Sequence, residues 1–402
     1  MPRPPTILQI IPALDTGGAE RTVIEVAEAI VRAGGTALVA SEAGWLAAEL
    51  AEVGGVLIPF PAGAKNPVKI IGNAWRLAAL IRARGVDLVH ARSRAPAWSA
   101  LMAARWTKRP FVTTYHGIYN QKSALKSWYN GVMARGDIVI ANSHYTGRIV
   151  RERHGIVDTR LCVIPRAVDL ERFSPQSVSD SRVAGLKASW GVPADARIVL
   201  QAARLTRWKG QHVLIGAAGL LKDRPEFRQA VVVIAGDDQG RNAYRAELLA
   251  RIENLGLKDK VILAGHCADM PAAFAAAWLT VIPSIEQEAF GRASIEAQAM
   301  GCPVIVSSGG ALPETIAEGG DGGWIAQAGD EAHLAEALEA ALKMTLQARA
   351  TRASAARRNA VGFSKTALQK KTLEVYDSLL ASRMANDYAA FPPGAEYAHH
   401  TA

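Results

Sequence analysis

The chain has 402 residues, of which 50% are hydrophobic and 21% charged, and its formal net charge is +9. This length exceeds one ordinary domain, and the composition is that of a globular protein with a large core. The three cysteines show no C-x-x-C spacing, which predicts neither a disulfide framework nor a zinc site and fits a cytoplasmic location. The apolar stretch at the start is too short for a signal peptide or a membrane span.

The positive charge is confined to the first part of the chain. Residues 1–170 contain 21 Lys and Arg against 12 Asp and Glu, whereas residues 171–402 contain 25 of each. A one-sided basic surface attracts nucleic acid, acidic lipid headgroups or a phosphorylated acceptor, although an ordinary solvated surface can have the same composition. Because the sequence has no zinc-finger pattern, RNP-type aromatic motif or arginine-rich arm, we expect no nucleic acid partner.

Short β-branched runs alternate with longer segments rich in alanine and leucine, which is typical of βα units around a parallel sheet. The strands predicted in the first half are TILQIIP, TALVAS, VLIPF, VDLVHA, FVTTYH, DIVIANS and LCVIP. Those predicted in the second half are RIVLQAA, AVVVIAG, KVILAG, LTVIPS, PVIVSS and GGWIAQ. Each set would form its own doubly wound sheet, so we expect an α/β protein with two Rossmann-like domains.

The domain boundary is predicted in the proline-punctuated segment VIPRAVDLERFSP, residues 163–175. We expect a basic N-terminal domain over residues 1–168, which would bind the acceptor, and a second domain over residues 169–363. An amphipathic helix over residues 364–383 would pack back toward the N-terminal domain, and residues 384–402 would form a disordered tail. Open parallel sheets bind ligands at the carboxyl ends of their strands, so motifs at strand ends carry the functional predictions.

Two glutamates follow a predicted strand end in VIPSIEQEAFGRASIEAQAMGCPVIVSS, residues 281–308. Glu288 falls in the loop and Glu296 on the next helix, with Phe290 and Gly291 at the turn between them. Free N–H groups at a helix start can bind an anion or sugar hydroxyls, and two carboxylates can accept hydrogen bonds from diols. The alternative is a solvated helix start, at which acidic residues are common.

Two cations follow another predicted strand end in VLQAARLTRWKGQHVLI. Arg204 and Lys209 flank a short loop before the helix that begins at Gly210. Such a pair can neutralise a diphosphate without a metal, the arginine as a fork and the lysine as a point charge. The sequence contains no Asp-x-Asp motif, so a metal clamp has no obvious ligands and we expect neither a metal nor a cofactor.

The combined pattern of Arg204, Lys209-Gly210, Glu288-Ala-Phe-Gly, Glu296 and Gly-Cys-Pro-Val resembles the retaining glycosyltransferases of family 4, which have the GT-B fold. TGGAER, TYHG and VIPRAVD extend the resemblance over nearly the whole chain. It implies two Rossmann-like domains facing across a cleft. It also implies an enzyme that moves a sugar from a nucleotide-diphosphate sugar to an acceptor hydroxyl with retention of anomeric configuration.

The resemblance assigns a donor-binding role to six residues of the second domain: Arg204 and Lys209 on the diphosphate, Glu288 on the sugar hydroxyls, Glu296 on the ribose, and the backbone of Phe290 and Gly291 against sugar and phosphate. The family often has glycine where this chain has Ala203, and Asn-Gly where it has Arg166 and Ala167. Neither departure removes a charge that the chemistry needs.

In the first domain the resemblance implies that Gly17 and Gly18 let a loop approach the donor, because glycine has no side chain to obstruct it. His116 would line the sugar site as a positioning and electrostatic residue. The departing diphosphate would be stabilised by preorganised positive groups, and its oxygen would take the acceptor's proton, so no protein base is required. The implied catalytic residues are His116, Arg204, Lys209 and Glu288.

The acceptor is less clearly indicated by the sequence. Arg92 and Arg94 follow a predicted strand and could bind a phosphorylated or carboxylated acceptor, although they could equally pair with neighbouring carboxylates. Residues 120–136 mix cations, Lys122 among them, with Trp128 and Tyr129, which suits shallow docking on an anionic bilayer. Bacterial members of the family often glycosylate lipid-linked or lipopolysaccharide acceptors. We therefore expect a cytoplasmic enzyme, peripheral on the inner face of the membrane.

Other functions remain open at this stage. A nucleotide-sugar epimerase or a sugar-phosphate synthase with a soluble acceptor would share the GT-B fold. A basic nucleic-acid-binding protein would leave the glutamate and lysine motifs unexplained, and a silent scaffold would not need the intact set of charges. A dehydrogenase is excluded because TGGAER does not provide the G-x-G-x-x-G pattern after the first strand.

Overall fold

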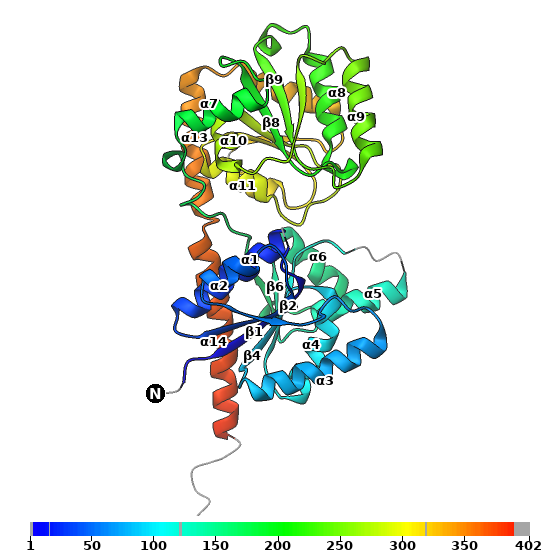
Figure 1. Cartoon of the computed structure of the whole chain (residues 1–402), viewed down its shortest axis with the longest axis vertical. Helices are drawn as coiled ribbons and strands as arrows, with labels where there is room; N and C mark the ends of the chain where they lie inside the picture. Colours follow the sequence, from blue (N-terminus) through cyan, green and yellow to red (C-terminus); the bar gives the residue numbers. More distant parts are fainter. Residues whose placement is uncertain (1–2, 16, 120–122, 318–319, 390–402) are drawn as a thin grey trace, which may run out of the picture. The chain divides into compact units, whose positions relative to one another are not determined.

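The computed structural model describes residues 3–15, 17–119, 123–317 and 320–389 (Figure 1). The chain forms two compact units, which are described separately. The N-terminal unit contains the chain up to Ala141 and takes up the chain again at Val150–Ile164 and from Gln369 onward. The C-terminal unit contains Asn142–Ile149 and Pro165–Leu368. The N-terminal unit is thus assembled from both ends of the sequence.

The N-terminal unit is built on a seven-stranded parallel sheet in the order β3-β2-β1-β4-β5-β6-β7. All seven strands predicted for the first half are present: β1 Thr6–Ala13, β2 Thr36–Glu42, β3 Val56–Pro59, β4 Leu88–Ala91, β5 Phe111–Tyr115, β6 Ile138–Ala141 and β7 Leu161–Val163. The helices that connect them are α1 Gly18–Arg32, α2 Ala47–Glu52, α3 Pro67–Ala83, α4 Arg94–Trp106, α5 Ala124–Asn130 and α6 His144–His154, of which α6 belongs to this unit only from Val150 onward.

The first strand shows why this sheet is buried on both faces. Ile7, Leu8, Ile10 and Ile11 in β1 are each at most 1% exposed although they alternate in direction. Such a continuous apolar run is typical of a parallel strand with helices on both sides of the sheet. Gln9 stands in the middle of this run and is also fully buried, so its amide needs polar partners inside the core.

The C-terminal unit is built on a six-stranded parallel sheet in the order β10-β9-β8-β11-β12-β13. Its strands are β8 Arg197–Ala202, β9 Ala230–Ala235, β10 Val261–Gly265, β11 Ala277–Ile282, β12 Val304–Ser307 and β13 Gly323–Ala326, as predicted for the second half. Its helices are α7 Asp180–Ser189, α8 Gln211–Leu221, α9 Asn242–Asn254, α10 Met270–Ala276, α11 Arg292–Ala299, α12 Glu331–Leu342 and α13 Leu346–Val361.

Each sheet reverses its strand order beside its first strand. β1 lies between β2 and β4, and β8 lies between β9 and β11. In doubly wound sheets the loops at the carboxyl ends of such strands diverge and leave a crevice in which ligands bind. The loops after β8 and β11 carry the cations and the first glutamate of the predicted donor motifs, so the topology places these residues where this fold class binds its ligands.

The last helix, α14 Lys365–Ala389, joins the N-terminal unit from residue Gln369 onward. Gln369 donates from Nε2 to the carbonyl of Glu25 in α1 at 2.8 Å, and the Tyr376 hydroxyl shares a 2.6 Å hydrogen bond with His90 Nδ1 in β4. The helix extends beyond residue 383, where the sequence analysis ended it. The remainder of the expected tail, residues 390–402, lies outside the described residues.

Candidate functional site

Two glutamine side chains hold the loop that follows β8. Gln201, buried in the strand, donates to the carbonyl of Lys209 at 2.8 Å, and Gln211 at the start of α8 donates to the carbonyl of Arg204 at 2.9 Å. The exposed Arg204 side chain donates to Gln239 Oε1 at 3.3 Å. The backbone at both predicted phosphate-binding cations is therefore fixed by buried amides at the carboxyl end of the sheet.

Gly210 allows this loop to meet the end of the neighbouring strand. Its φ of +72° lies in the left-handed region, and a Cβ added to it would lie 1.9 Å from the carbonyl oxygen of Pro283, directly after β11. A side chain at this position would be unfavourable both for the backbone conformation and for the contact. The loops after β8 and β11 can therefore lie against each other only with glycine at this position.

Lys209 and Glu288 form an ion pair between these two loops. The lysine Nζ lies 2.8 Å from Glu288 Oε1, and the Ser284 hydroxyl donates to the same carboxylate oxygen. Glu288 is only 8% exposed, so its charge is stabilised by these two donors and its orientation is fixed. The ammonium has three protons and can bind a phosphate oxygen while it keeps the carboxylate as a partner.

The segment after β12, which contains Gly310, pairs with the backbone of Glu288. The amide of Ala311 donates to the Glu288 carbonyl at 2.8 Å, and Gly310 pairs with Glu288 in an isolated parallel bridge. Gly310 has a φ of +70°, and a Cβ there would lie 2.3 Å from the Glu288 carbonyl oxygen. Ser284 and Gly310 were not predicted from the sequence, and the adjacent glycines directly after the strand PVIVSS were the available signal for Gly310.

The helix α11 carries the second glutamate. Glu296 accepts a 3.0 Å hydrogen bond from Arg292 Nε one turn earlier, and both side chains are mostly enclosed. Phe290 is 5% exposed and packs on Phe363 with ring centroids 5.9 Å apart, so its side chain belongs to the core. At Gly291 a Cβ would meet the Leu312 side chain at 2.6 Å. The turn at Phe290 and Gly291 can therefore contact a ligand only through its backbone.

The predicted residues of the N-terminal unit stand at the ends of β1 and β5. Gly17 caps α1 and Gly18 begins it; a Cβ on Gly17 would lie 2.1 Å from Glu20 Oε2. His116 directly follows β5 and lies close enough to His90 to lower the pKa of that buried imidazole, after the larger effects of burial and of the Arg92 charge. His116 therefore occupies the carboxyl end of the sheet.

Arg92 and Arg94 have different surroundings. Arg92 is 2% exposed: its Nε donates to Gln9 Oε1 at 2.9 Å, and burial lowers its pKa. Arg94 is half-buried, donates to Asn130 Oδ1 at 2.9 Å and lies 4.1 Å from the ring centroid of Tyr119. The acceptor-binding role expected for Arg92 stays a prediction that this enclosed position disfavours, whereas Arg94 remains open to it.

The structure thus brings Lys209 and Glu288 into direct contact and places Arg204 on the same loop as the lysine. Within the described part of the chain, no three His, Cys, Asp or Glu side chains gather as a metal ion would require. The same described ranges contain no helix that is both long enough and apolar enough to cross a bilayer.

Comparisons with known proteins agree with the pattern in the sequence. The family model described as glycosyl transferases group 1 matches residues 185–359, and the model described as glycosyltransferase family 4 matches residues 16–172. The D-inositol 3-phosphate glycosyltransferase of Kineococcus radiotolerans is 31% identical over 329 residues, covering 75% of this chain and 74% of the relative. The chain belongs to the group 1 and family 4 glycosyltransferases.

Solved structures extend the likeness of this glycosyltransferase to the whole fold. A glycosyltransferase from Rickettsia africae ESF-5 is 33% identical with a TM-score of 0.86, covering 94% of this chain and 98% of that one. Anabaena Alr3699/HepE, solved with UDP and glucose, is 26% identical with a TM-score of 0.79, covering 93% and 99%. The two Rossmann-like domains therefore form a GT-B glycosyltransferase, and the predicted fold class is confirmed.

Proposed function

We propose that this glycosyltransferase takes its sugar from a uridine diphosphate sugar bound at the carboxyl ends of β8 and β11. The observation that carries the proposal is the Lys209–Glu288 pair, in which the cation predicted to bind phosphate lies 2.8 Å from the carboxylate predicted to bind sugar hydroxyls. Exposed Arg204 on the same loop would provide the second cation for the diphosphate. The UDP-containing structures of the 26% identical Anabaena protein support uridine as the base.

In the proposed reaction, positive charge rather than a metal ion stabilises the departing diphosphate. Arg204 and Lys209 would face the phosphate oxygens on which charge develops, and preorganised donors of this kind supply a large part of transition-state stabilisation. Glu288 would hold hydroxyls of the transferred sugar and Glu296 those of the ribose. The acceptor would attack from the face that the diphosphate leaves, which retains the anomeric configuration. The role of His116 in positioning the sugar stays a prediction.

For the acceptor we propose a hydroxyl compound that also bears a phosphate. The Kineococcus relative is named for D-inositol 3-phosphate, and the first part of this chain has a large excess of cations that suits such an anion. A lipid-linked precursor of a surface polysaccharide or lipopolysaccharide is the form that we favour, because Leu125 and Trp128 are 76% and 56% exposed on the N-terminal unit. The enzyme would then act in the cytoplasm at the inner face of the membrane.

Isothermal titration with a panel of nucleoside diphosphates, without added metal, tests the donor site. We expect UDP to bind the wild type in the micromolar range and Lys209→Ala to weaken it by about 10- to 100-fold, since a hydrogen bond to a charged group contributes about 1.5–3 kcal/mol. Glu296→Ala should also weaken UDP. Arg207→Ala is the matched control, because this exposed cation of the same loop pairs with Glu247.

The outcomes separate the parts of this proposal. If no nucleoside diphosphate binds, or if Arg207→Ala weakens UDP as much as Lys209→Ala does, the donor site is wrong. Transfer activity that chelation abolishes and Mg²⁺ restores would contradict the metal-independent mechanism alone. The anomeric configuration of the product, read by NMR, decides between retention and inversion.

A further inference from the structure

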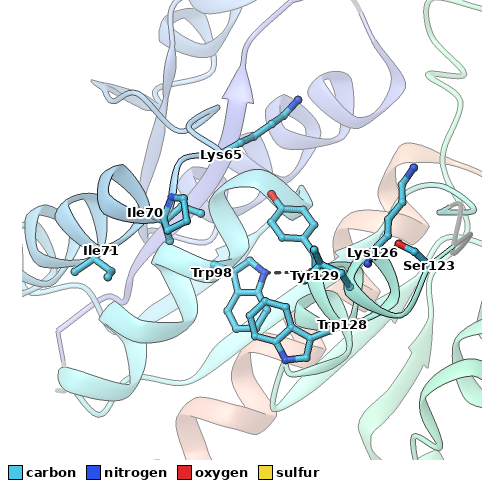
Figure 2. A pocket seen from close by; sticks show the side chains of 10 residues that line it. Lys65, Ile70, Ile71, Trp98, Ser123, Lys126, Trp128 and Tyr129 are labelled. Carbon is cyan, nitrogen blue, oxygen red and sulfur yellow. Dashed lines mark hydrogen bonds between the residues drawn. The ribbon is translucent and has the colours of Figure 1, made fainter.

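A preformed apolar groove opens on the N-terminal unit, and none of the residues predicted to bind the donor lines it. Its volume is about 480 Å³, within the range of small-molecule sites. Figure 2 shows its walls: α3 contributes Ile70 and Ile71, α4 contributes Trp98, and α5 contributes Trp128 and Tyr129. Except for the residues at its rim, the groove is lined by aliphatic and aromatic carbon.

The aromatic wall of this groove is held in place by specific contacts. Trp98 donates from its indole nitrogen to the carbonyl of Tyr129 at 3.1 Å, and its ring stacks on Trp128 with centroids 4.5 Å apart and an interplanar angle of 27° (Figure 2). The guanidinium of Arg135 lies 4.9 Å from the Trp98 centroid. A ligand would therefore meet a fixed surface and would not have to order loose side chains.

The apolar surface continues out of the groove onto solvent-facing residues. Leu125 is 76% exposed, Trp128 56% and Ile71 50%, and Val68 and Trp75 on α3 are 79% and 63% exposed. Val68, Ile71 and Trp75 recur at helical spacing, so they form one stripe along α3. Single exposed apolar residues are ordinary, but a contiguous set around a groove marks a surface that binds an apolar partner.

The charged residues that line the groove have one sign. They are Lys65 and Lys126, and none of the other lining residues is acidic. Figure 2 shows the ammonium groups of Lys65 and Lys126 at the rim, pointing away from the apolar walls. A partner that fits both the walls and the rim has a hydrocarbon body and an anionic head.

The groove also lies close to the arginine that remained open to acceptor binding. The Tyr129 hydroxyl is buried and has no hydrogen-bond partner among the described residues. Burial raises the pKa of this phenol, and the charge of Arg94 opposes that shift, which places the arginine near the hydroxyl. The groove-lining Tyr129 thus lies beside a further cation of the N-terminal unit.

We propose that this groove holds one hydrocarbon chain of a phosphate-bearing lipid, with the phosphate at Lys65 and Lys126. A lipid fits better than an apolar protein segment because the rim offers only positive charge to its occupant. The exposed stripe on α3 would rest in the bilayer surface from which the lipid comes. The identification of this lipid as the sugar acceptor rests on the proposed function, whereas its binding can be measured without any transfer.

Titration of the full chain with palmitoyl lysophosphatidic acid, below its micelle concentration, tests the groove. Glycerol 3-phosphate supplies the head without the chain, and palmitoyl lysophosphatidylcholine supplies the chain with a zwitterionic head. We expect the lysophosphatidic acid to bind, the zwitterionic lipid to bind more weakly, and glycerol 3-phosphate to bind at least about 100-fold more weakly, since burial of several methylenes is lost.

One pair of variants isolates the groove. Leu125→Asp places a carboxylate at the apolar wall and should weaken the lipid about tenfold or more, since the contact of Leu125 with the hydrocarbon chain is lost and a like charge faces the phosphate. Leu346→Asp in the C-terminal unit is the matched control, because Leu346 is 75% exposed and Leu125 is 76% exposed. Both positions are open to solvent, so neither change should disturb folding.

Three results would overturn the proposal. The first is equal binding of the lysophosphatidic acid and glycerol 3-phosphate, and the second is equal weakening of lipid binding by both variants. The third is self-association of the wild type in the absence of lipid that Leu125→Asp abolishes. This third result would assign the groove to a second copy of the chain. A UDP titration of the same samples keeps the two proposals apart. Binding of UDP without the lipid refutes the groove alone, and binding of the lipid without any nucleotide refutes the donor site alone.

Discussion

Replacement of Gly210 by alanine tests whether the candidate site depends on the close contact between the loops after β8 and β11. The new Cβ would lie 1.9 Å from the Pro283 carbonyl oxygen, and non-bonded heavy atoms are in favourable contact only at about 3.5–4.0 Å. The backbone must therefore move by more than about 1 Å. Since Lys209 is the preceding residue, its ammonium would leave its position beside Glu288.

The loss of stability expected for Gly210→Ala has two parts, and a second variant separates them. A non-glycine residue at positive φ costs about 1–2 kcal/mol, and overpacking adds about 1–3 kcal/mol. Gly256 has a similar φ of +68°, and a Cβ there would meet nothing within 4 Å, so Gly256→Ala carries only the first cost. For a unit of about 200 residues, 1 kcal/mol shifts the melting temperature by about 2–4 °C.

The assay is thermal unfolding of both variants, followed by transfer kinetics. We expect Gly256→Ala to lower the melting temperature by about 2–8 °C and Gly210→Ala by about 4–20 °C. A displacement of about 1 Å in a catalytic group can cost about 100-fold in rate, so kcat/KM of Gly210→Ala should fall by that order while Gly256→Ala stays near the wild type. Equal melting temperatures and equal activities of the two variants would refute the reasoning.

Two further predictions concern the interior of the N-terminal unit. Burial, then the charges of Arg92 and His116, hold the pKa of His90 well below its usual value of 6.5, so below pH 6.5 the unfolded chain binds a proton that the folded chain does not. This group should therefore make the free energy of unfolding fall by up to about 1.4 kcal/mol for each unit that the pH falls. The fall should be less steep in His90→Gln. Urea unfolding of both proteins at pH 7 and pH 5.5 measures the difference. Arg92→Ala should cost about 1–3 kcal/mol because it leaves the buried Gln9 amide oxygen unpaired. Arg94→Ala removes the donor to the buried Asn130 Oδ1, so it should also lower stability, and in addition it should raise KM for the acceptor. An unchanged KM for Arg94→Ala, in the same unfolding and kinetic measurements, would contradict its acceptor role.

The sequence was sufficient to predict the strands and the two strand-end motifs, because parallel strands buried on both faces leave uninterrupted apolar runs. The run before Arg204 and the run before Ser284 are examples, and each ends where its charged loop begins. The predicted roles of these loops in donor binding stay predictions.

Other features depend on contacts that no local pattern records. Arg92 follows a strand just as Arg204 does. Only the register of β1 and β4 shows that Gln9 lies beside Arg92, where its amide oxygen accepts a hydrogen bond from the buried guanidinium. A lone glutamine in an apolar strand was the available signal, and Gln201 is a second instance in β8. The groove was missed because its walls come from three helices that are separated in the sequence.

The route of α14 has a consequence for synthesis of the protein on the ribosome. Tyr376 and Gln369 complete the interior of a unit whose other strands and helices all precede residue 165. At about 5–20 residues per second, translation of the intervening stretch of about 200 residues takes about 10–40 s. For that time the nascent N-terminal sheet lacks its last helix and exposes the surface around His90. The half of the chain that emerges first can therefore finish folding only after the second half has been made.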